Sequence, residues 1–202
     1  MKRLVIATAV SALLLTGCAT PGDDTTAAPA TTAPSAAPSA SAGAGPLLAS
    51  HGLDGKSTVE IIDHLDRLSL QERPTDLRAS VRPGELVVSG GAQEVGLPVP
   101  DDRFYLSVAP YTDQTHECFH HSLTTCKGEL AARDIQVKIV DETNGRVLVD
   151  ETRTTFANGF TGFWLPRGIE GTLKITYGGR TGEAEITTGQ EAPTCLTTLR
   201  LA

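Results

Sequence analysis

One segment of the chain concentrates the residue types that bind transition metals. Between Thr115 and Cys126 lie three of the five histidines and two of the four cysteines. Thiolate and imidazole form a soft-to-borderline ligand set that suits Cu(I) and Zn(II). The same set does not suit Ca(II) or Mg(II), which prefer oxygen ligands. The segment therefore predicts a transition-metal site.

The spacing within this segment suggests how the side chains meet. If the segment begins as a strand, His116, Cys118 and His120 share one face, and His121 lies on the other. A turn over residues 122–125 then returns the next cysteine to the same region, and the fold must bring in the last one, which is remote in sequence. The candidate ligands are three thiolates, with one or more histidines completing the site or relaying the ion to it: Cys118, Cys126, Cys195, His116, His120 and His121.

A plain structural disulfide is the main alternative. Exported proteins normally oxidise their thiols, so Cys118 and Cys126 could form a bridge and leave Cys195 free. An odd number of thiols and three nearby histidines exceed what one bridge requires, which favours a metal site. The two interpretations are compatible as a redox couple, in which the reduced form binds metal and oxidation releases it. No C-x2-C pair of the zinc-finger type is present.

The fourth cysteine belongs to the N-terminal segment. Lys2 and Arg3 precede an apolar run over residues 4–15, which predicts a secretory signal peptide over residues 1–17. The sequence Leu15-Thr16-Gly17-Cys18 matches a bacterial lipobox, so we expect diacylglycerol on Cys18 and anchoring at the outer face of the cytoplasmic membrane. Residues 18–46 are almost entirely Ala, Thr, Ser, Pro and Gly, which predicts a disordered tether.

Residues 47–99 predict a small helical region. Ser57 and Glu60 form a capping box, and apolar residues follow at helical spacing, so we expect a helix over residues 57–70. The apolar stripe has no aromatic residue, so this helix must dock on a larger element or pair with a copy of itself. His64 is expected to be a surface or packing histidine and not a ligand, and residues 86–89 predict one short strand.

Residues 100–202 predict a β-rich domain. All nine aromatic residues lie between Phe104 and Tyr177, which places the principal core here. The turn pair Asn144-Gly145 predicts a hairpin. Strand-like segments separated by such turns predict an antiparallel sandwich or open barrel, and with the preceding helix an α+β fold. The expected strands cover residues 104–108, 135–140, 147–149, 172–177 and 183–187.

Composition and absent motifs exclude several classes of function. The formal net charge of −7 argues against nucleic-acid binding, which requires a basic face. Met1 is the only methionine, which excludes a Met-rich metal site. The sequence contains no G-x-S-x-G, Walker, H-E-x-x-H or C-x-x-C motif, so an enzyme is not expected. The only reaction that the thiols suggest is reduction of Cu(II).

Several segments together resemble the CueP family of bacterial periplasmic copper-binding proteins. The resemblance covers residues 55–202, and its most specific part is the stretch from Cys118 to Cys126. It implies copper binding at the three cysteines, an N-terminal region that dimerises, and supply of copper to a secreted Cu,Zn superoxide dismutase. The lipobox and tether depart from the soluble members of the family. The matching segments are 105–111, 115–130, 158–167 and 193–199.

These observations lead to one hypothesis and two alternatives. The hypothesis is an extracytoplasmic, lipid-anchored protein that sequesters or delivers copper, most simply as Cu(I). One alternative is a β-domain interaction module stapled by a Cys118–Cys126 disulfide, without a metal. The other is a zinc-binding domain that uses the same ligands.

Overall fold

A computed structural model describes residues 44–202. The predicted signal peptide, the predicted lipidation site at Cys18 and the predicted tether up to residue 43 lie outside these residues. The predicted end of the tether does not match, because residues 44–46 belong to helix α1, where Ala44, Leu47 and Leu48 are buried. Neither helix of residues 44–202 is long and apolar enough to cross a bilayer.

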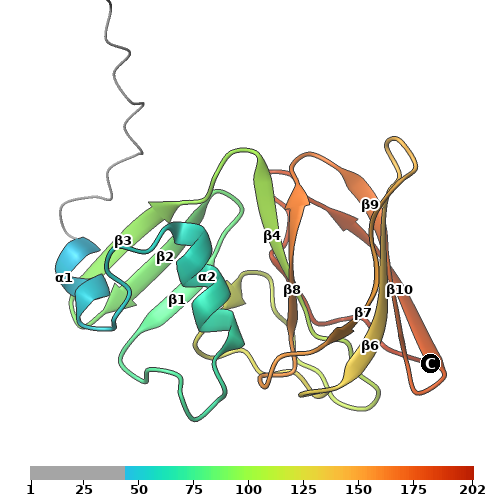
Figure 1. The fold of residues 1–202 in the computed structure, drawn as a ribbon, viewed down its shortest axis with the longest axis horizontal. Helices are drawn as coiled ribbons and strands as arrows, with labels where there is room; N and C mark the ends of the chain where they lie inside the picture. The colour runs from blue at the N-terminus through green and yellow to red at the C-terminus, as the bar shows by residue number, and fades with distance from the viewer. Residues whose placement is uncertain (1–43) are drawn as a thin grey trace, which may run out of the picture. The chain divides into compact units, whose positions relative to one another are not determined.

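The described chain contains two helices and eleven strands (Figure 1). The two helices precede all the strands in sequence, and two of the strands are only two residues long. The elements are α1 (Ala44–Ala49), α2 (Thr58–Arg67), β1 (Arg78–Val81), β2 (Glu85–Gly90), β3 (Gln93–Pro98), β4 (Arg103–Val108), β5 (His121–Ser122), β6 (Asp134–Asp141), β7 (Arg146–Thr154), β8 (Thr161–Pro166), β9 (Glu170–Tyr177), β10 (Arg180–Thr187) and β11 (Cys195–Leu196).

Helix α2 begins where the sequence predicts and ends earlier. The Ser57 side chain accepts a hydrogen bond from the Glu60 amide, and the Glu60 carboxylate accepts one from the Ser57 amide, which confirms the capping box. The helix ends at Arg67, because Leu68 adopts an extended conformation. Its buried face carries three apolar residues and one carboxylate: Ile61, Ile62, Leu65 and Asp66.

The helices pack with a four-stranded sheet in the order β3-β2-β1-β5. One continuous core contains buried residues of α1, α2 and β1 to β3, together with Leu123 from the turn after β5. Residues 47–99 therefore contain three strands in addition to the predicted helix α2. They also include the last three residues of α1, a helix that the sequence analysis did not predict. The fourth strand, β5, comes from much later in the chain and pairs with β1 at Ser80 and Val81.

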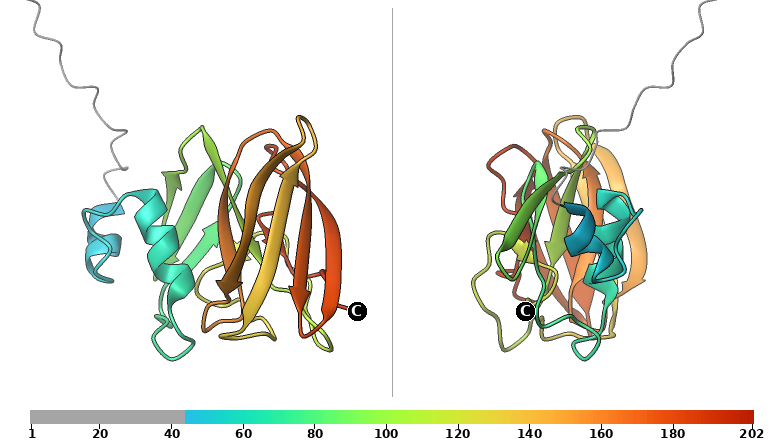
Figure 2. Two further views of the ribbon diagram at one scale, coloured as in Figure 1. Left: turned by 45° about the vertical axis from the view of Figure 1, so that its right-hand side comes forward. Right: turned by 90° about the vertical axis from the view of Figure 1, so that its left-hand side faces the viewer.

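The second core lies between two further sheets (Figure 2). One has the order β10-β9-β6-β7 and the other β11-β4-β8, and only β11 and β4 pair in parallel. The two sheets form no closed barrel within residues 44–202, which confirms the predicted α+β class with a mainly antiparallel β part. The predicted hairpin at Asn144-Gly145 is also confirmed, since it joins β6 to β7 with Gly145 at a φ of 72°.

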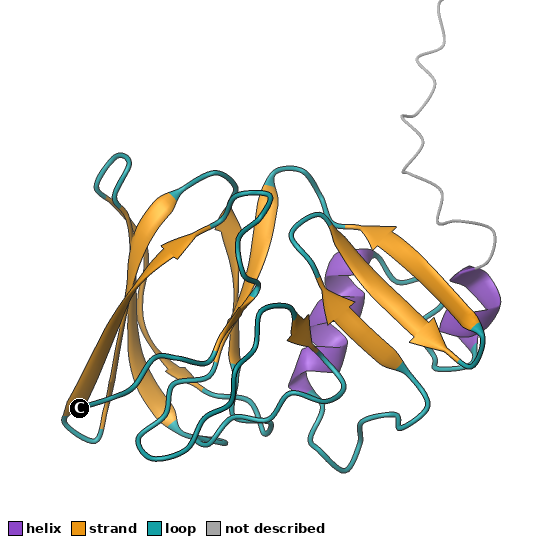
Figure 3. Cartoon of the chain, turned by 180° about the vertical axis from the view of Figure 1, so that it is seen from behind, coloured by secondary structure: helices purple, strands orange, loops and turns teal. Residues whose placement is uncertain are grey.

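Two short strands at the edges of two different sheets carry candidate metal ligands. His121 opens β5, which pairs with β1 of the first sheet. Cys195 opens β11, which pairs with Ser107 and Val108 of β4. Figure 3 shows β5 in a region that is otherwise mostly loop, next to α2. Strands β5 and β11 therefore bring together His121 and Cys195, which are 74 positions apart in sequence.

We predict that Gly162→Ala destabilises the protein. Gly162 pairs with Ser107 across β4 and β8, and a Cβ atom at this position would overlap the Tyr105 hydroxyl. Tyr105 is buried and packs against Trp164 with ring centroids 4.7 Å apart and the rings tilted by 53°, so it has little room to move. Overpacking of this kind costs about 1–3 kcal/mol, measurable by denaturant unfolding.

Gly189→Ala is the matched control, because a Cβ there would meet nothing within 4 Å and its φ is not in the left-handed region. Equal free energies of unfolding for the two variants would contradict the packing argument.

Candidate metal centre

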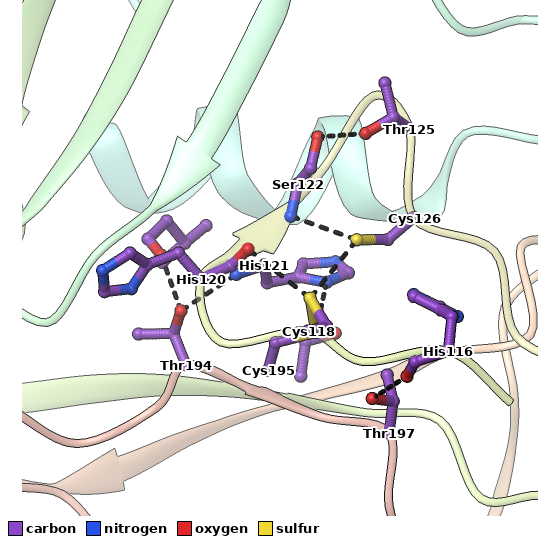
Figure 4. The surroundings of a disulfide bond; sticks show 12 residues. His116, Cys118, His120, His121, Ser122, Thr125, Cys126, Thr194, Cys195 and Thr197 are labelled. Atoms are coloured by element: carbon purple, nitrogen blue, oxygen red, sulfur yellow. Dashed lines mark hydrogen bonds between the residues drawn. A yellow bond between two sulfur atoms is a disulfide. The ribbon is translucent and has the colours of Figure 1, made fainter.

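Four ligand atoms converge at one point of the structure. The Cys118, Cys126 and Cys195 sulfur atoms and a His121 ring nitrogen all lie within 4.8 Å of one another. Cys118 and Cys195 form a disulfide, and Cys126 is a free thiol. The Cys126 sulfur lies 3.6 Å from the Cys118 sulfur, and His121 Nδ1 lies 3.7 Å from the Cys195 sulfur. Figure 4 shows these four side chains facing a common centre.

Backbone and hydroxyl contacts hold Cys195 next to the loop that carries Cys118. The amides of Thr194 and Cys195 both donate to the Phe119 carbonyl oxygen, at 3.0 and 3.2 Å. The Thr194 hydroxyl donates to the Val81 carbonyl and accepts a hydrogen bond from the His121 amide. One threonine therefore ties β11 to β1 and to β5, so the relative position of Cys195 and His121 is fixed.

Cys126 ends the turn that follows β5, as the sequence predicts. Its amide donates to the Ser122 carbonyl at 3.1 Å, and the Ser122 amide donates back to the Cys126 sulfur at 3.4 Å. The buried Arg73 side chain donates through Nη1 to the Cys126 carbonyl at 2.6 Å. These contacts fix the half-buried thiol against the disulfide.

A buried carboxylate orients the imidazole. Asp66 and His121 are both fully buried, and His121 Nε2 donates to Asp66 Oδ1 at 2.8 Å. Asp66 also accepts hydrogen bonds from Tyr105, Ser107 and Asn158 at 2.6, 3.2 and 3.1 Å. A carboxylate partner on one ring nitrogen is the usual arrangement behind a metal-binding histidine. It leaves Nδ1 to face the sulfur atoms.

The same contacts set the charges of the site. Burial alone would lower the pKa of His121, but the Asp66 carboxylate outweighs it and raises this pKa to about 9. Burial opposes ionisation of Asp66, yet the His121 charge and the hydrogen bonds hold its pKa below the usual value. Burial alone would raise the pKa of the Cys126 thiol. His121, Ser122 and Arg73 outweigh this effect, so the pKa lies below the ordinary thiol value. A cation that binds Nδ1 must displace a proton.

The structure corrects the predicted strand over this segment. Residues 112–120 form no strand, so the alternation that placed His116 and His120 beside Cys118 does not occur. Both histidines are exposed and lie outside the cluster, while His121 supplies the ring nitrogen. The physical reason is that this loop is tied to the C-terminal segment, where the Thr197 hydroxyl donates to the His116 carbonyl at 2.5 Å.

The structure also changes the pairing expected for a structural disulfide. The bridge joins Cys118 to Cys195 across 77 positions, and the free thiol is Cys126 instead of Cys195. The parallel pairing of β11 with β4 delivers Cys195, and nothing local in the sequence indicates that register. Of the six candidate ligands, the structure brings together Cys118, His121, Cys126 and Cys195.

The most important residue that the sequence analysis missed is Asp66. It follows Ile62 by four positions, so it lies on the buried face of α2. A carboxylate at a core position of an amphipathic helix requires a buried partner, because an unpaired buried charge is costly. That spacing is a signal in the sequence, although it does not say which residue the partner is.

The fold and the cluster define an α+β protein with a buried thiol–imidazole centre of the type that binds soft and borderline metal ions. Residues 60–200 match the family model described as periplasmic copper-binding protein CueP. The protein in the crystal structure of S.CueP is 42% identical to this chain in sequence. The match has a TM-score of 0.75 and covers 81% of this chain and 100% of that chain. The curated proteins yielded no match. The chain belongs to the CueP family of periplasmic copper-binding proteins.

The raised pKa of His121 predicts how stability depends on pH in the metal-free protein. Because the folded-state pKa of about 9 exceeds the ordinary value of 6.5, the Asp66–His121 pair stabilises fully below pH 6.5. This contribution, about 3 kcal/mol, is lost as the pH rises through 9. Denaturant unfolding of wild type and Asp66→Asn at both ends of this range measures it.

Asp66→Asn should remove most of this pH dependence, because the imidazole loses the charge that holds its proton. His64→Gln is the control, since His64 is exposed on the same helix. The account is contradicted if Asp66→Asn and His64→Gln lose the same stability between pH 6.5 and pH 9.

Proposed function

We propose that this chain binds copper as Cu(I) through Cys118, Cys126 and Cys195, with His121 as the fourth ligand. The observation that carries the proposal is the convergence of these four ligand atoms within 4.8 Å. Thiolates favour Cu(I), and membership of a family described as copper-binding supports copper over zinc for the same donor set.

The redox state of the cysteines controls how many ligands the site offers. With the Cys118–Cys195 disulfide in place, only the Cys126 thiol and the His121 nitrogen are available. After reduction, three thiols face the imidazole. The reduced form is therefore the copper-loaded one, and oxidation releases the ion.

The same cysteines could reduce Cu(II) as it arrives. Two Cu(II) ions would take one electron each from the Cys118 and Cys195 thiols. This forms the disulfide, two Cu(I) ions and two protons, so electrons and atoms balance. The exposed His116 and His120 lie on the loop beside Cys118, and we propose that they meet the incoming ion before the thiols do.

The family and the N-terminal sequence support a proposal for the location of the protein. The family description is periplasmic, which supports an extracytoplasmic protein. We propose that Cys18 carries the lipid and that residues 19–43 tether the described part to the outer face of the cytoplasmic membrane. There it would sequester copper or deliver it to a recipient such as a secreted Cu,Zn superoxide dismutase, and residues 47–99 would form the contact of a homodimer.

Copper binding has a direct test in competition titrations with a Cu(I) chelator under anaerobic, reducing conditions. Cys195→Ser should weaken Cu(I) binding by at least about tenfold, because it removes one ligand of the cluster. His116→Gln is the matched control, since His116 lies outside the cluster, and its affinity should equal that of wild type. Equal affinities for all three proteins would exclude Cys195 as a ligand, and tighter binding of Zn(II) than Cu(I) would favour the zinc alternative.

The anchor is tested separately by cell fractionation. Wild type should be recovered with membranes, and Cys18→Ser should move to the soluble extracytoplasmic fraction, because it lacks the thiol that forms the thioether. Mass spectrometry of the N-terminal peptide should detect diacylglycerol only on wild type. An unlipidated Cys18 in the mature protein would overturn the proposed anchor.

A further inference from the structure

The geometry points to an internal thiol–disulfide exchange in which Cys126 attacks the Cys118–Cys195 disulfide. The Cys126 sulfur is in contact with the Cys118 sulfur at 3.6 Å, and Cys126 is the one free thiol of residues 44–202. Exchange would form a Cys118–Cys126 disulfide and release Cys195. The inference concerns the site of the proposed function, but it does not depend on copper.

The structure holds the attacking sulfur next to its target but not in line with the bond that breaks. An in-line sulfur would lie about 5.6 Å from the Cys195 sulfur, whereas all the ligand atoms lie within 4.8 Å of one another, so the Cys126 side chain must rotate before it attacks. The turn after β5 fixes the Cys126 backbone, and the Ser122 amide donates to its sulfur at 3.4 Å. Arg73 is buried, and its Nη1 donates to the Cys126 carbonyl, while its Nε and Nη2 atoms have no partner within residues 44–202. The thiolate is the nucleophile in disulfide exchange, so the step begins when the Cys126 thiol gives up its proton.

The leaving group also has a partner. When the Cys126 sulfur bonds to Cys118, the bond between Cys118 and Cys195 breaks, and its electron pair stays on the Cys195 sulfur. His121 Nδ1 lies 3.7 Å from that sulfur and can supply the proton, and the proton released by Cys126 restores the imidazolium. One disulfide and one thiol are present before and after the step, so it needs no oxidant or reductant.

The exchange would move the disulfide toward solvent. Cys195 is 2% exposed, whereas Cys118 and Cys126 are both half-buried. The exchange therefore replaces the buried Cys195 by the half-buried Cys126 in the bridge, while Cys118 belongs to both bridges. Exchange also leaves the buried Cys195 as a thiol beside His121. The oxidised protein is thus a pair of isomers that differ in which cysteine is free.

Disulfide mapping of the metal-free, oxidised wild-type protein tests this inference. The full chain is incubated with a metal chelator at pH 8, free thiols are alkylated over a time course, and samples are quenched and digested in acid. Exchange predicts two products: alkylated Cys126 with a Cys118–Cys195 bridge, and alkylated Cys195 with a Cys118–Cys126 bridge. The proportion of the second should not depend on protein concentration, because the step is intramolecular.

Two outcomes would overturn the inference. One is alkylation of Cys126 alone at every time, and the other is a Cys118–Cys126 bridge whose formation accelerates with protein concentration. Cys126→Ser is the matched control, and it should keep the Cys118–Cys195 bridge with no alkylated Cys195. Since no copper is present, failure here leaves the proposed copper site untouched, and failure of Cu(I) binding leaves the exchange untouched.

Discussion

The buried contact between Asp66 and His121 is the constraint on which the rest of the site depends. Two ionisable side chains with no exposed surface are costly to bury, and they persist only when paired and hydrogen-bonded. Tyr105, Ser107 and Asn158 complete the set of donors around the carboxylate. This network joins α2 to β4 and β5, so the same contact stabilises the fold and aims the imidazole at the sulfur atoms.

The cysteines add a second, reversible constraint. The Cys118–Cys195 bridge joins the loop before β5 to β11, and Cys126 stands against it as a free thiol. Ala109, Phe160 and Cys195 form a small buried apolar cluster, and Cys118 and Cys126 pack against it. This packing limits the access of water to the sulfur atoms. A site built in this way offers soft thiol donors when it is reduced, whereas in the oxidised form two of these sulfur atoms are joined in a disulfide. This difference suits capture and release of a thiophilic cation.

Local signals predicted the elements better than they predicted the site. The capping box at Ser57 and the hairpin at Asn144-Gly145 depend on short-range chemistry, and both are confirmed. The choice among His116, His120 and His121 depended on a strand that does not form, because contacts with the C-terminal segment hold that loop. The disulfide partner of Cys118 depends on the long-range pairing of β11 with β4, which no local pattern encodes.

X-ray absorption spectroscopy of the reduced protein loaded with one equivalent of Cu(I) is the most direct test of the central claim. The account predicts a first shell dominated by sulfur, together with imidazole scattering that disappears in His121→Gln and persists in His120→Gln. A first shell of nitrogen and oxygen without sulfur, or imidazole scattering unchanged in His121→Gln, would contradict it.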